Sequence, residues 1–490
     1  MKRSILGICL LLTIFLTSCR YTDFLHEFIR ENAVSGNGIS GSSITGASVT
    51  GAATTGQAVE STKAAIDGKG ESDFSASQGA VRTDIVSGSG VSVSEDVDAR
   101  MLTAEYWIGK TYAKDQILQD HKKIQSANQN RMDALHEDTD SGYADFYSSE
   151  SEMTGSRLHV LMAREFLLKG TYYQDKRAVS QSDIKAYIEN CAIDRLSDFN
   201  SIRFAVICEQ TDVRELPTKD RLSVSVDDSS DLLWTTTISV NEPVLVLATS
   251  RDEKWFFIMS DRTAGWVPVS TLAFCRDKEE WNSYQTISDF LIVTGQRAVI
   301  GGEQWEFPLS KETVLQMGTR LPLASEKEIA GAQKSYGSRT PVWNNYWIRY
   351  PVRREDGSLS YEILPVPMDE NVHCGYLELT RSQILQQAMR WQGHFMGQGE
   401  NAAGTMVGCI MDCFGVRMPV KNSAWQKLAS TDKDLVKDVP DASNVSVTNQ
   451  LVPGMIALYD QAPAIYLGVD SQKKYVLCIQ NHIVVVKTLK

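Results

Sequence analysis

Several features that would point to a function class are absent from the sequence. Lys and Arg total 49 against 61 Asp and Glu, so the formal net charge is −12. Nucleic-acid binding needs clustered basic residues, and such a partner is therefore not expected. No Cys-x-x-Cys pair or histidine cluster suggests a metal site, and no cofactor is predicted. The nine cysteines have no regular spacing, which argues against a disulfide framework.

The sequence also lacks an apolar run of the about 20 residues that a membrane-spanning helix needs. Its uncharged run over residues 5–17 is shorter, follows Lys2 and Arg3, and fits a secretory signal. The run ends in Leu-Thr-Ser-Cys at Cys19, which resembles a bacterial lipobox. We expect residues 1–19 to be a signal peptide and Cys19 to be acylated. The protein would be exported and membrane-anchored, facing the cell wall or periplasm. An ordinary signal peptide with a chance cysteine is the alternative.

Aromatic residues are nearly missing from about residue 33 to residue 95, where Phe74 stands alone. This stretch is rich in Ser, Gly, Thr, Ala and Val, and a five-residue repeat runs through its start. Such a composition cannot bury enough apolar area to offset the entropy of ordering the chain. We predict a flexible tether over residues 20–95, with a reach of about 45 Å. A small β-solenoid is the alternative, because the period is strict.

The rest of the chain shows a change from helical to strand patterns and back. In residues 96–200 apolar side chains recur at intervals of three and four residues, which predicts a helical N-terminal domain. Short runs rich in Val, Ile, Phe and Trp then predict small antiparallel barrels over 201–285 and 286–376. Residues 377–490 read as helices followed by four strands. Thr380 is a candidate N-cap of the first helix, and the second lies near 403–414.

Several strings in this part resemble, in order, a group of NlpC/p60 cell-wall peptidases. They are residues 211–218, 241–247, 254–257, 265–267, 317–323, 375–380 and 383–388. The resemblance implies an α+β multidomain protein. A helical N-terminal stabilising domain would be followed by two SH3-like β-barrels and a papain-like (NlpC/p60) α+β C-terminal domain. Members of the group cut peptidoglycan stem peptides, usually next to a D-glutamyl γ-linkage.

The resemblance also implies a catalytic cysteine at a helix N-terminus, a histidine base and a third residue that orients the base. Counting back from the family-like segment 414–419 puts Ala403 at the cysteine. Ala462 falls at the histidine, before a family-like strand, and Cys478 at the third position. A methyl group cannot attack a carbonyl, so catalysis is not expected. A displaced nucleophile at Cys409, Cys413 or Cys478 is the alternative.

The expected ligand groove is less well defined. The aromatic-glycine entrance of the family is replaced by a segment that includes Gln398 and Glu400. The first barrel helps to form one wall of the groove in this group, so Trp255 is a candidate groove residue, whereas Trp266 is expected to pack.

We therefore expect a catalytically silent envelope lipoprotein. It would bind peptidoglycan stem peptides or a wall-hydrolase partner through its NlpC/p60-like domain and SH3-like modules. The first alternative is an active cysteine endopeptidase that cleaves next to γ-D-glutamyl linkages in wall peptides. The second is a structural spacer that binds nothing.

Overall fold

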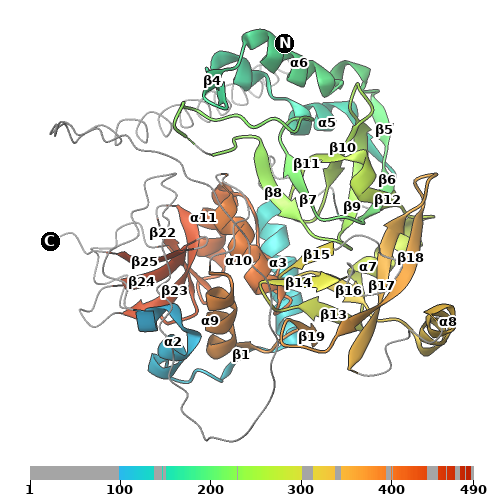
Figure 1. Ribbon diagram of the computed structural model, residues 1–490. Coiled ribbons are helices and arrows are strands. Elements are labelled where there is room, and N and C mark those ends of the chain that lie inside the picture. The colour runs from blue at the N-terminus through green and yellow to red at the C-terminus, as the bar shows by residue number, and fades with distance from the viewer. Residues whose placement is uncertain are drawn as a thin grey trace, which may run out of the picture. The chain divides into compact units, whose positions relative to one another are not determined.

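The computed structural model describes most of the chain after residue 98 (Figure 1). The described residues are 99–136, 146, 150–228, 230–300, 313–336, 344–392, 399, 401–438, 451–459, 461–469, 475–479 and 482–486. The predicted signal peptide with Cys19, the predicted tether, Gln398 and Glu400 lie outside them. Among the helices that are described, none is long and apolar enough to cross a membrane.

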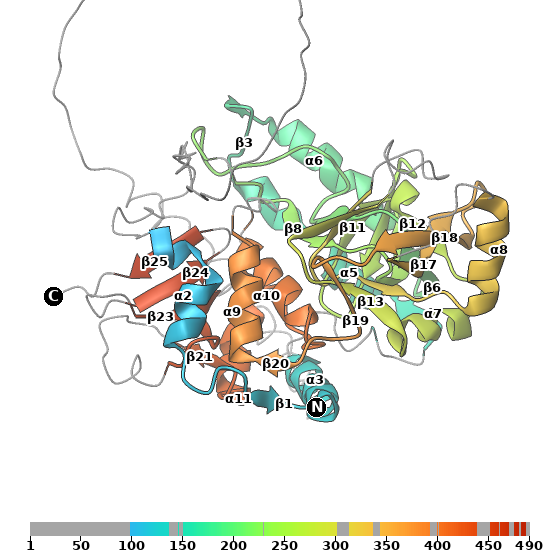
Figure 2. The same cartoon turned by 60° about the horizontal axis from the view of Figure 1, so that its bottom comes forward.

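The first described segment packs on the C-terminal part of the chain (Figure 2). Its strand β1 pairs with β20, and the fully buried Trp107 donates its indole N–H to the Met101 carbonyl at 2.8 Å. Arg131 forms an ion pair with Asp432 at 2.6 Å. These residues therefore share a core with the C-terminal helices, although the sequence pattern places them in the region 96–200. The elements are η1 (Ala99–Leu102), α2 (Ala104–Lys110), β1 (Ile117–Gln119) and α3 (His121–His136).

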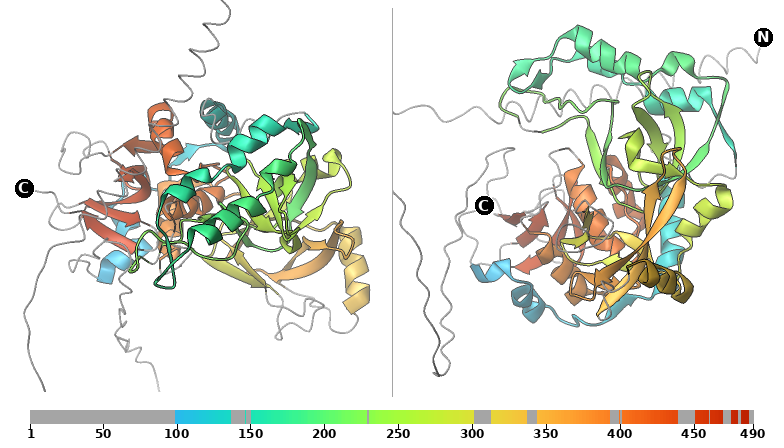
Figure 3. Two further views of the ribbon diagram at one scale, coloured as in Figure 1. Left: turned by 90° about the horizontal axis from the view of Figure 1, so that it is seen from above. Right: turned by 45° about the vertical axis from the view of Figure 1, so that its right-hand side comes forward.

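The second part of the region 96–200 packs on the first barrel instead, as the two views of Figure 3 show. Two of its helices begin at side-chain N-caps, where the Thr154 hydroxyl accepts from the Arg157 amide and the Ser180 hydroxyl from the Asp183 amide. Its elements are β2 (Glu152–Thr154), α5 (Gly155–Met162), η2 (Glu165–Lys169), β3 (Tyr173–Gln174), β4 (Arg177–Ala178), α6 (Gln181–Asn190), η3 (Ile193–Arg195) and β5 (Phe199–Ser201).

The first barrel is a seven-stranded sheet with the order β12-β6-β9-β10-β11-β7-β8. Strand β10 is buried along its whole length, and its residues alternate between two cores. Trp255, Phe257 and Met259 pack against α5 and α6, whereas Phe256 and Ile258 fill the other side. Period-two alternation explains why a wholly apolar run forms a strand here. The strands are β6 (Arg203–Ile207), β7 (Thr211–Arg214), β8 (Trp234–Ile238), β9 (Pro243–Thr249), β10 (Trp255–Met259), β11 (Ala264–Pro268) and β12 (Leu272–Phe274), and η4 (Val269–Thr271) precedes β12.

The second predicted barrel contains three small sheets around one apolar core. Its long hairpin β17–β18 turns at Gly357, whose φ of +86° is a conformation that glycine adopts without a Cβ clash. The elements from α7 onward are α7 (Lys278–Gln285), β13 (Phe290–Val293), β14 (Arg297–Ile300), β15 (Thr313–Gln316), β16 (Arg320–Pro322), α8 (Glu326–Tyr336), β17 (Asn345–Arg353), β18 (Leu359–Pro367) and β19 (Val372–Cys374).

The C-terminal elements are three helices followed by a five-stranded sheet (Figure 1). Thr380 caps the first helix by accepting from the Gln383 amide at 3.2 Å, as predicted. Strand β21 pairs parallel with β22, and the remaining neighbours are antiparallel. The elements are β20 (Leu379–Thr380), α9 (Arg381–Arg390), α10 (Ala402–Asp412), α11 (Asn422–Thr431), β21 (Val436–Asp438), β22 (Ile456–Tyr459), β23 (Ala462–Val469), β24 (Tyr475–Ile479) and β25 (His482–Val486).

Candidate functional site

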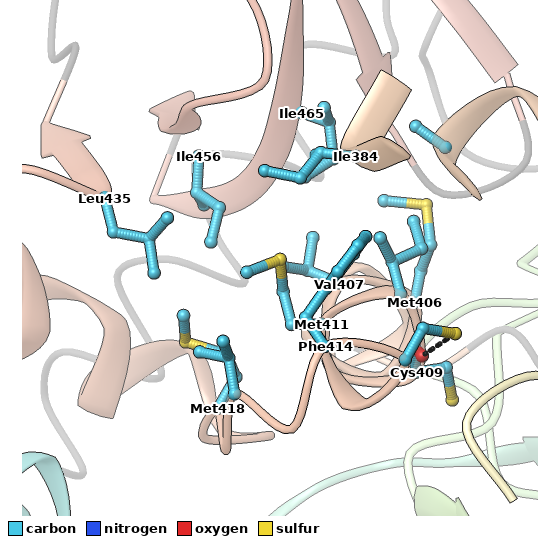
Figure 4. Packing of buried hydrophobic residues seen from close by; sticks show 14 of the residues in the cluster. Ile384, Met406, Val407, Cys409, Met411, Phe414, Met418, Leu435, Ile456 and Ile465 are labelled. Carbon is cyan, nitrogen blue, oxygen red and sulfur yellow. Dashed lines mark hydrogen bonds between the residues drawn. The ribbon is translucent and has the colours of Figure 1, made fainter. Parts of the chain in front are cut away.

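Helix α10 is the central element of the candidate site. It begins at Ala402, so Ala403 is its second residue, and the helix packs against β23. Met406, Val407, Met411 and nearby apolar side chains of other elements form the core on its inner face (Figure 4). The first turn of a helix has unpaired amide groups and the positive end of the helix dipole, which is where a cysteine thiolate would be stabilised. At this turn the protein has Ala402, Ala403 and Gly404.

The first turn of α10 is closed off by neighbouring elements. Strand β8 of the first barrel approaches it, and the hydroxyls of Thr236 and Thr405 lie 2.8 Å apart in a buried contact. A Cβ on Gly404 would come within 2.2 Å of the Val420 carbonyl oxygen, so this turn packs closely against the segment that precedes α11. Ala403 is 1% exposed. The position that resembles the family nucleophile is thus buried as well as unreactive.

The two positions that match the family's histidine and third catalytic residue lie on neighbouring strands. Ala462 is the first residue of β23, is half-buried, and pairs with Tyr459 of β22. Cys478 is on β24, where its backbone pairs with Ile465. Ile465 lies three residues beyond Ala462, which is about 10 Å along a strand. The strand register therefore does not place Cys478 directly beside Ala462.

Two thiols lie away from the N-terminus of α10, that of Cys409 within the helix and that of Cys413 at its C-cap. Cys409 is 6% exposed and Cys413 is 0% exposed, and both belong to the core around α10. Figure 4 labels Cys409 among the apolar side chains of this core. Burial, with the Asp412 carboxylate adding to it, raises the pKa of Cys409 to about 12 and that of Cys413 well above its ordinary value. The Cys413 thiol lies 3.6 Å from the Cys409 carbonyl oxygen, its acceptor one helical turn back. Both thiols are therefore protonated core groups at neutral pH.

The C-terminal end of α10 is attached to the first barrel by a buried ionic cluster. Arg262 contacts Asp412 at 2.7 Å and Glu242 at 3.3 Å, and Arg417 contacts Asp261 at 2.6 Å. Arg417 also reaches Asp412 at 3.2 Å and Glu242 at 3.4 Å, so the two guanidinium groups share the carboxylates. No side chain of the cluster is more than 18% exposed.

The charges in this cluster shift the pKa values of neighbouring groups. Burial by itself would raise the pKa of Glu242, but Arg417 and Arg262 more than offset this and lower it to about 2. Burial would likewise lower the pKa of Arg262, and the Asp412 carboxylate outweighs it, so that pKa is raised. Glu242 and Arg262 are therefore ionised at neutral pH. Local sequence patterns do not reveal the cluster, because its residues are scattered over two domains. Glu242 and Arg417 lie inside the family-like segments 241–247 and 414–419, whereas the other three residues lie outside any such segment.

Of the candidate groove residues, Trp255 lies in the described part of the chain, whereas Gln398 and Glu400 fall outside it. Trp255 is 6% exposed and packs with Phe257 and Trp266 in the core between the first barrel and α5. Part of it lines a hollow beside α6, which is a different place from the α10 N-terminus. Trp266 is fully buried, in agreement with the expected packing role.

Comparisons with known proteins agree with this architecture. Residues 229–268 match the family described as SH3 domain (SH3b1 type). Among solved structures, the chain is similar to an NlpC/P60 endopeptidase from Photobacterium damselae subsp. piscicida. The TM-score is 0.52 at 13% identity, over 76% of this chain and 86% of that one. At this identity the likeness shows the fold alone. No curated protein matches the sequence.

Proposed function

We propose that the protein is an envelope lipoprotein, anchored through Cys19, that binds peptidoglycan stem peptides without cutting them. The SH3 match supports a wall-binding role, and the likeness to an endopeptidase supports a papain-like arrangement of α10 and the sheet. The observation that carries the proposal is the start of α10. A papain-like enzyme needs a nucleophilic side chain there, and this helix begins Ala402-Ala403-Gly404.

The nearby thiols do not supply a substitute nucleophile. A cysteine attacks as its thiolate, and burial holds Cys409 and Cys413 in the protonated form at neutral pH. They also lie two to three turns from the helix end whose dipole would favour the anion. The alternative of an active cysteine endopeptidase therefore has no support from these two residues.

The function test is binding of a defined stem peptide to the chain from Arg20 onward, measured by isothermal titration calorimetry. We expect saturable binding, with the peptide recovered intact at the end of the titration. A wall hydrolase in place of the peptide is the second arm, because that partner would bind the same domain as a protein surface. If neither the peptide nor the hydrolase binds, the protein is a spacer and the proposal is wrong.

A second test asks whether restoring the family's catalytic residues restores hydrolysis. The variant Ala403→Cys should remain inactive, because Ala462 supplies no base. The double variant Ala403→Cys/Ala462→His adds both groups, and the buried setting of Ala403 predicts weak activity at best. Turnover by the single variant comparable to that of an NlpC/p60 enzyme would show that a base is present that the proposal does not include.

A further inference from the structure

A hollow of about 780 Å³ lies on the first barrel, beside the helices of residues 150–200. Its walls come from the end of α6, the turn between β9 and β10, and the segments that follow β7 and β11. None of its lining residues belongs to the C-terminal elements. The volume falls in the usual range of small-ligand sites, about 300–1,000 Å³.

Part of the lining is apolar. It includes Trp255, which is 6% exposed, together with Pro217, Pro268 and Val269. Asn190 of α6 fixes the shape by bonding to two of the walls. Its side-chain amide donates to the Pro217 carbonyl at 3.1 Å, and its side-chain oxygen accepts from the Asp252 amide at 3.1 Å. The hollow is therefore held open by packed elements rather than by a single loop.

Most charges at the rim are already engaged. Arg251 donates to the Glu189 carbonyl at 3.0 Å and forms an ion pair with Asp194. The Glu189 carboxylate pairs with Lys185 at 3.5 Å. The Asp252 carboxylate accepts from the Ser250 hydroxyl at 2.6 Å and from the Lys254 backbone amide at 3.2 Å.

Two exposed ammonium groups also line the rim, those of Lys219 and Lys254. Neither forms an ion pair within 4.0 Å in the described part of the chain, although the Lys254 charge contributes to lowering the pKa of Asp252. The hollow thus presents two exposed ammonium groups in a chain whose formal net charge is −12. Anionic ligands are favoured where such charges meet an apolar surface that excludes water.

We propose that this hollow binds a short acidic peptide. The carboxylates would lie against Lys219 and Lys254, while aliphatic side chains and backbone cover Pro217, Pro268 and the edge of Trp255. A phosphate polymer fits less well. Arginine is the side chain that clamps phosphate with two parallel bonds, and Arg251 is held by Asp194 and the α6 carbonyl. This proposal is independent of whether the C-terminal domain is catalytically active.

The test uses the chain from Arg20 onward and isothermal titration calorimetry. The probe is the blocked peptide acetyl-Ala-Glu-Ala-Glu-amide, and the neutral comparison is acetyl-Ala-Gln-Ala-Gln-amide. We expect the acidic peptide to bind at least about tenfold more tightly, and its affinity to fall as salt rises. The double variant Lys219→Gln/Lys254→Gln should lose at least about tenfold in affinity for the acidic peptide.

The matched control removes two positive charges elsewhere. Lys327→Gln/Lys334→Gln changes exposed lysines of α8 and should leave the affinity within about twofold. All variants should keep the wild-type melting temperature, since none of these lysines is buried. Equal binding of the neutral peptide, an unchanged affinity in the Lys219/Lys254 variant, or tighter binding of polyphosphate than of the peptide would overturn the proposal. None of these results would bear on the proposal that the N-terminus of α10 is catalytically inactive.

Discussion

Replacing Arg417 by methionine tests how the first barrel is held to α10. The change keeps most of the side-chain volume but removes a guanidinium that contacts Asp261 at 2.6 Å, Asp412 at 3.2 Å and Glu242 at 3.4 Å. Three carboxylates would then face Arg262 as their main partner. Breaking a buried ion pair by removing one member costs about 3–5 kcal/mol, because the remaining charge stays buried without compensation.

This destabilisation should depend on pH in a defined direction. The folded-state pKa of Glu242 is about 2, below the ordinary value of 4.5. Its stabilising contribution is therefore present above pH 4.5 and is lost as the pH falls toward 2. The shift corresponds to about 3 kcal/mol at neutral pH, of which about half remains at pH 3. The difference in unfolding free energy between wild type and Arg417→Met should narrow between pH 7 and pH 3, by at most roughly 2 kcal/mol, because Arg262 still lowers the Glu242 pKa in the variant.

Urea unfolding of the chain from Arg20 onward, followed by circular dichroism, measures this gap. With a slope of about 2 kcal/mol per molar urea, the transition of the C-terminal elements should shift down by about 2 M at pH 7. The control is Arg276→Met, which removes an exposed arginine paired with Asp277 and should cause no measurable shift. A loss below about 1 kcal/mol, or a gap that is the same at both pH values, would refute the reasoning.

Three other predictions follow from the same packing and from the lipobox. Gly404→Ala should destabilise the C-terminal elements by about 2 kcal/mol or more in urea, because the new methyl would lie 2.2 Å from the Val420 carbonyl oxygen. A thiol reagent should label the exposed Cys374 fast and the buried Cys409 only on unfolding; equal rates would contradict the packing. Mass spectrometry of the membrane form should find an acylated Cys19 at the N-terminus, and an unmodified upstream terminus would exclude it.

Local patterns in the sequence identified much of the fold. Met406, Val407, Ile410 and Met411 recur at intervals of three and four residues, which predicts the second C-terminal helix. The structure has α10 over Ala402–Asp412. Counting back from the family-like segment placed Ala403 at the start of that helix, which is where it lies. The wholly apolar stretch of β10 is one of the short Val-, Ile-, Phe- and Trp-rich runs that predict strands within 201–285. Short-range periodicity determines these elements, so it can be read without knowledge of the rest of the chain.

Long-range contacts were not predictable in the same way. The pairing of β1 with β20 joins Ile117 to Thr380, and no local pattern indicates that the first described helices pack on the last domain. The ionic cluster has the same origin, since Arg262 and Asp412 are separated by 150 positions and each looks like an ordinary surface charge. The closure of the α10 N-terminus by β8 likewise depends on the docking of two domains, which propensity and spacing do not specify.

The most direct test of the account is incubation of the wild-type chain with defined muropeptides under reducing conditions, with the products detected by mass. Acyl transfer from an amide needs an activated nucleophile within reach of a base, and the α10 N-terminus has only Ala402, Ala403 and Gly404. We predict that every muropeptide is recovered uncut. Turnover that disappears in Cys478→Ala or Cys409→Ala would contradict the account and identify a displaced nucleophile.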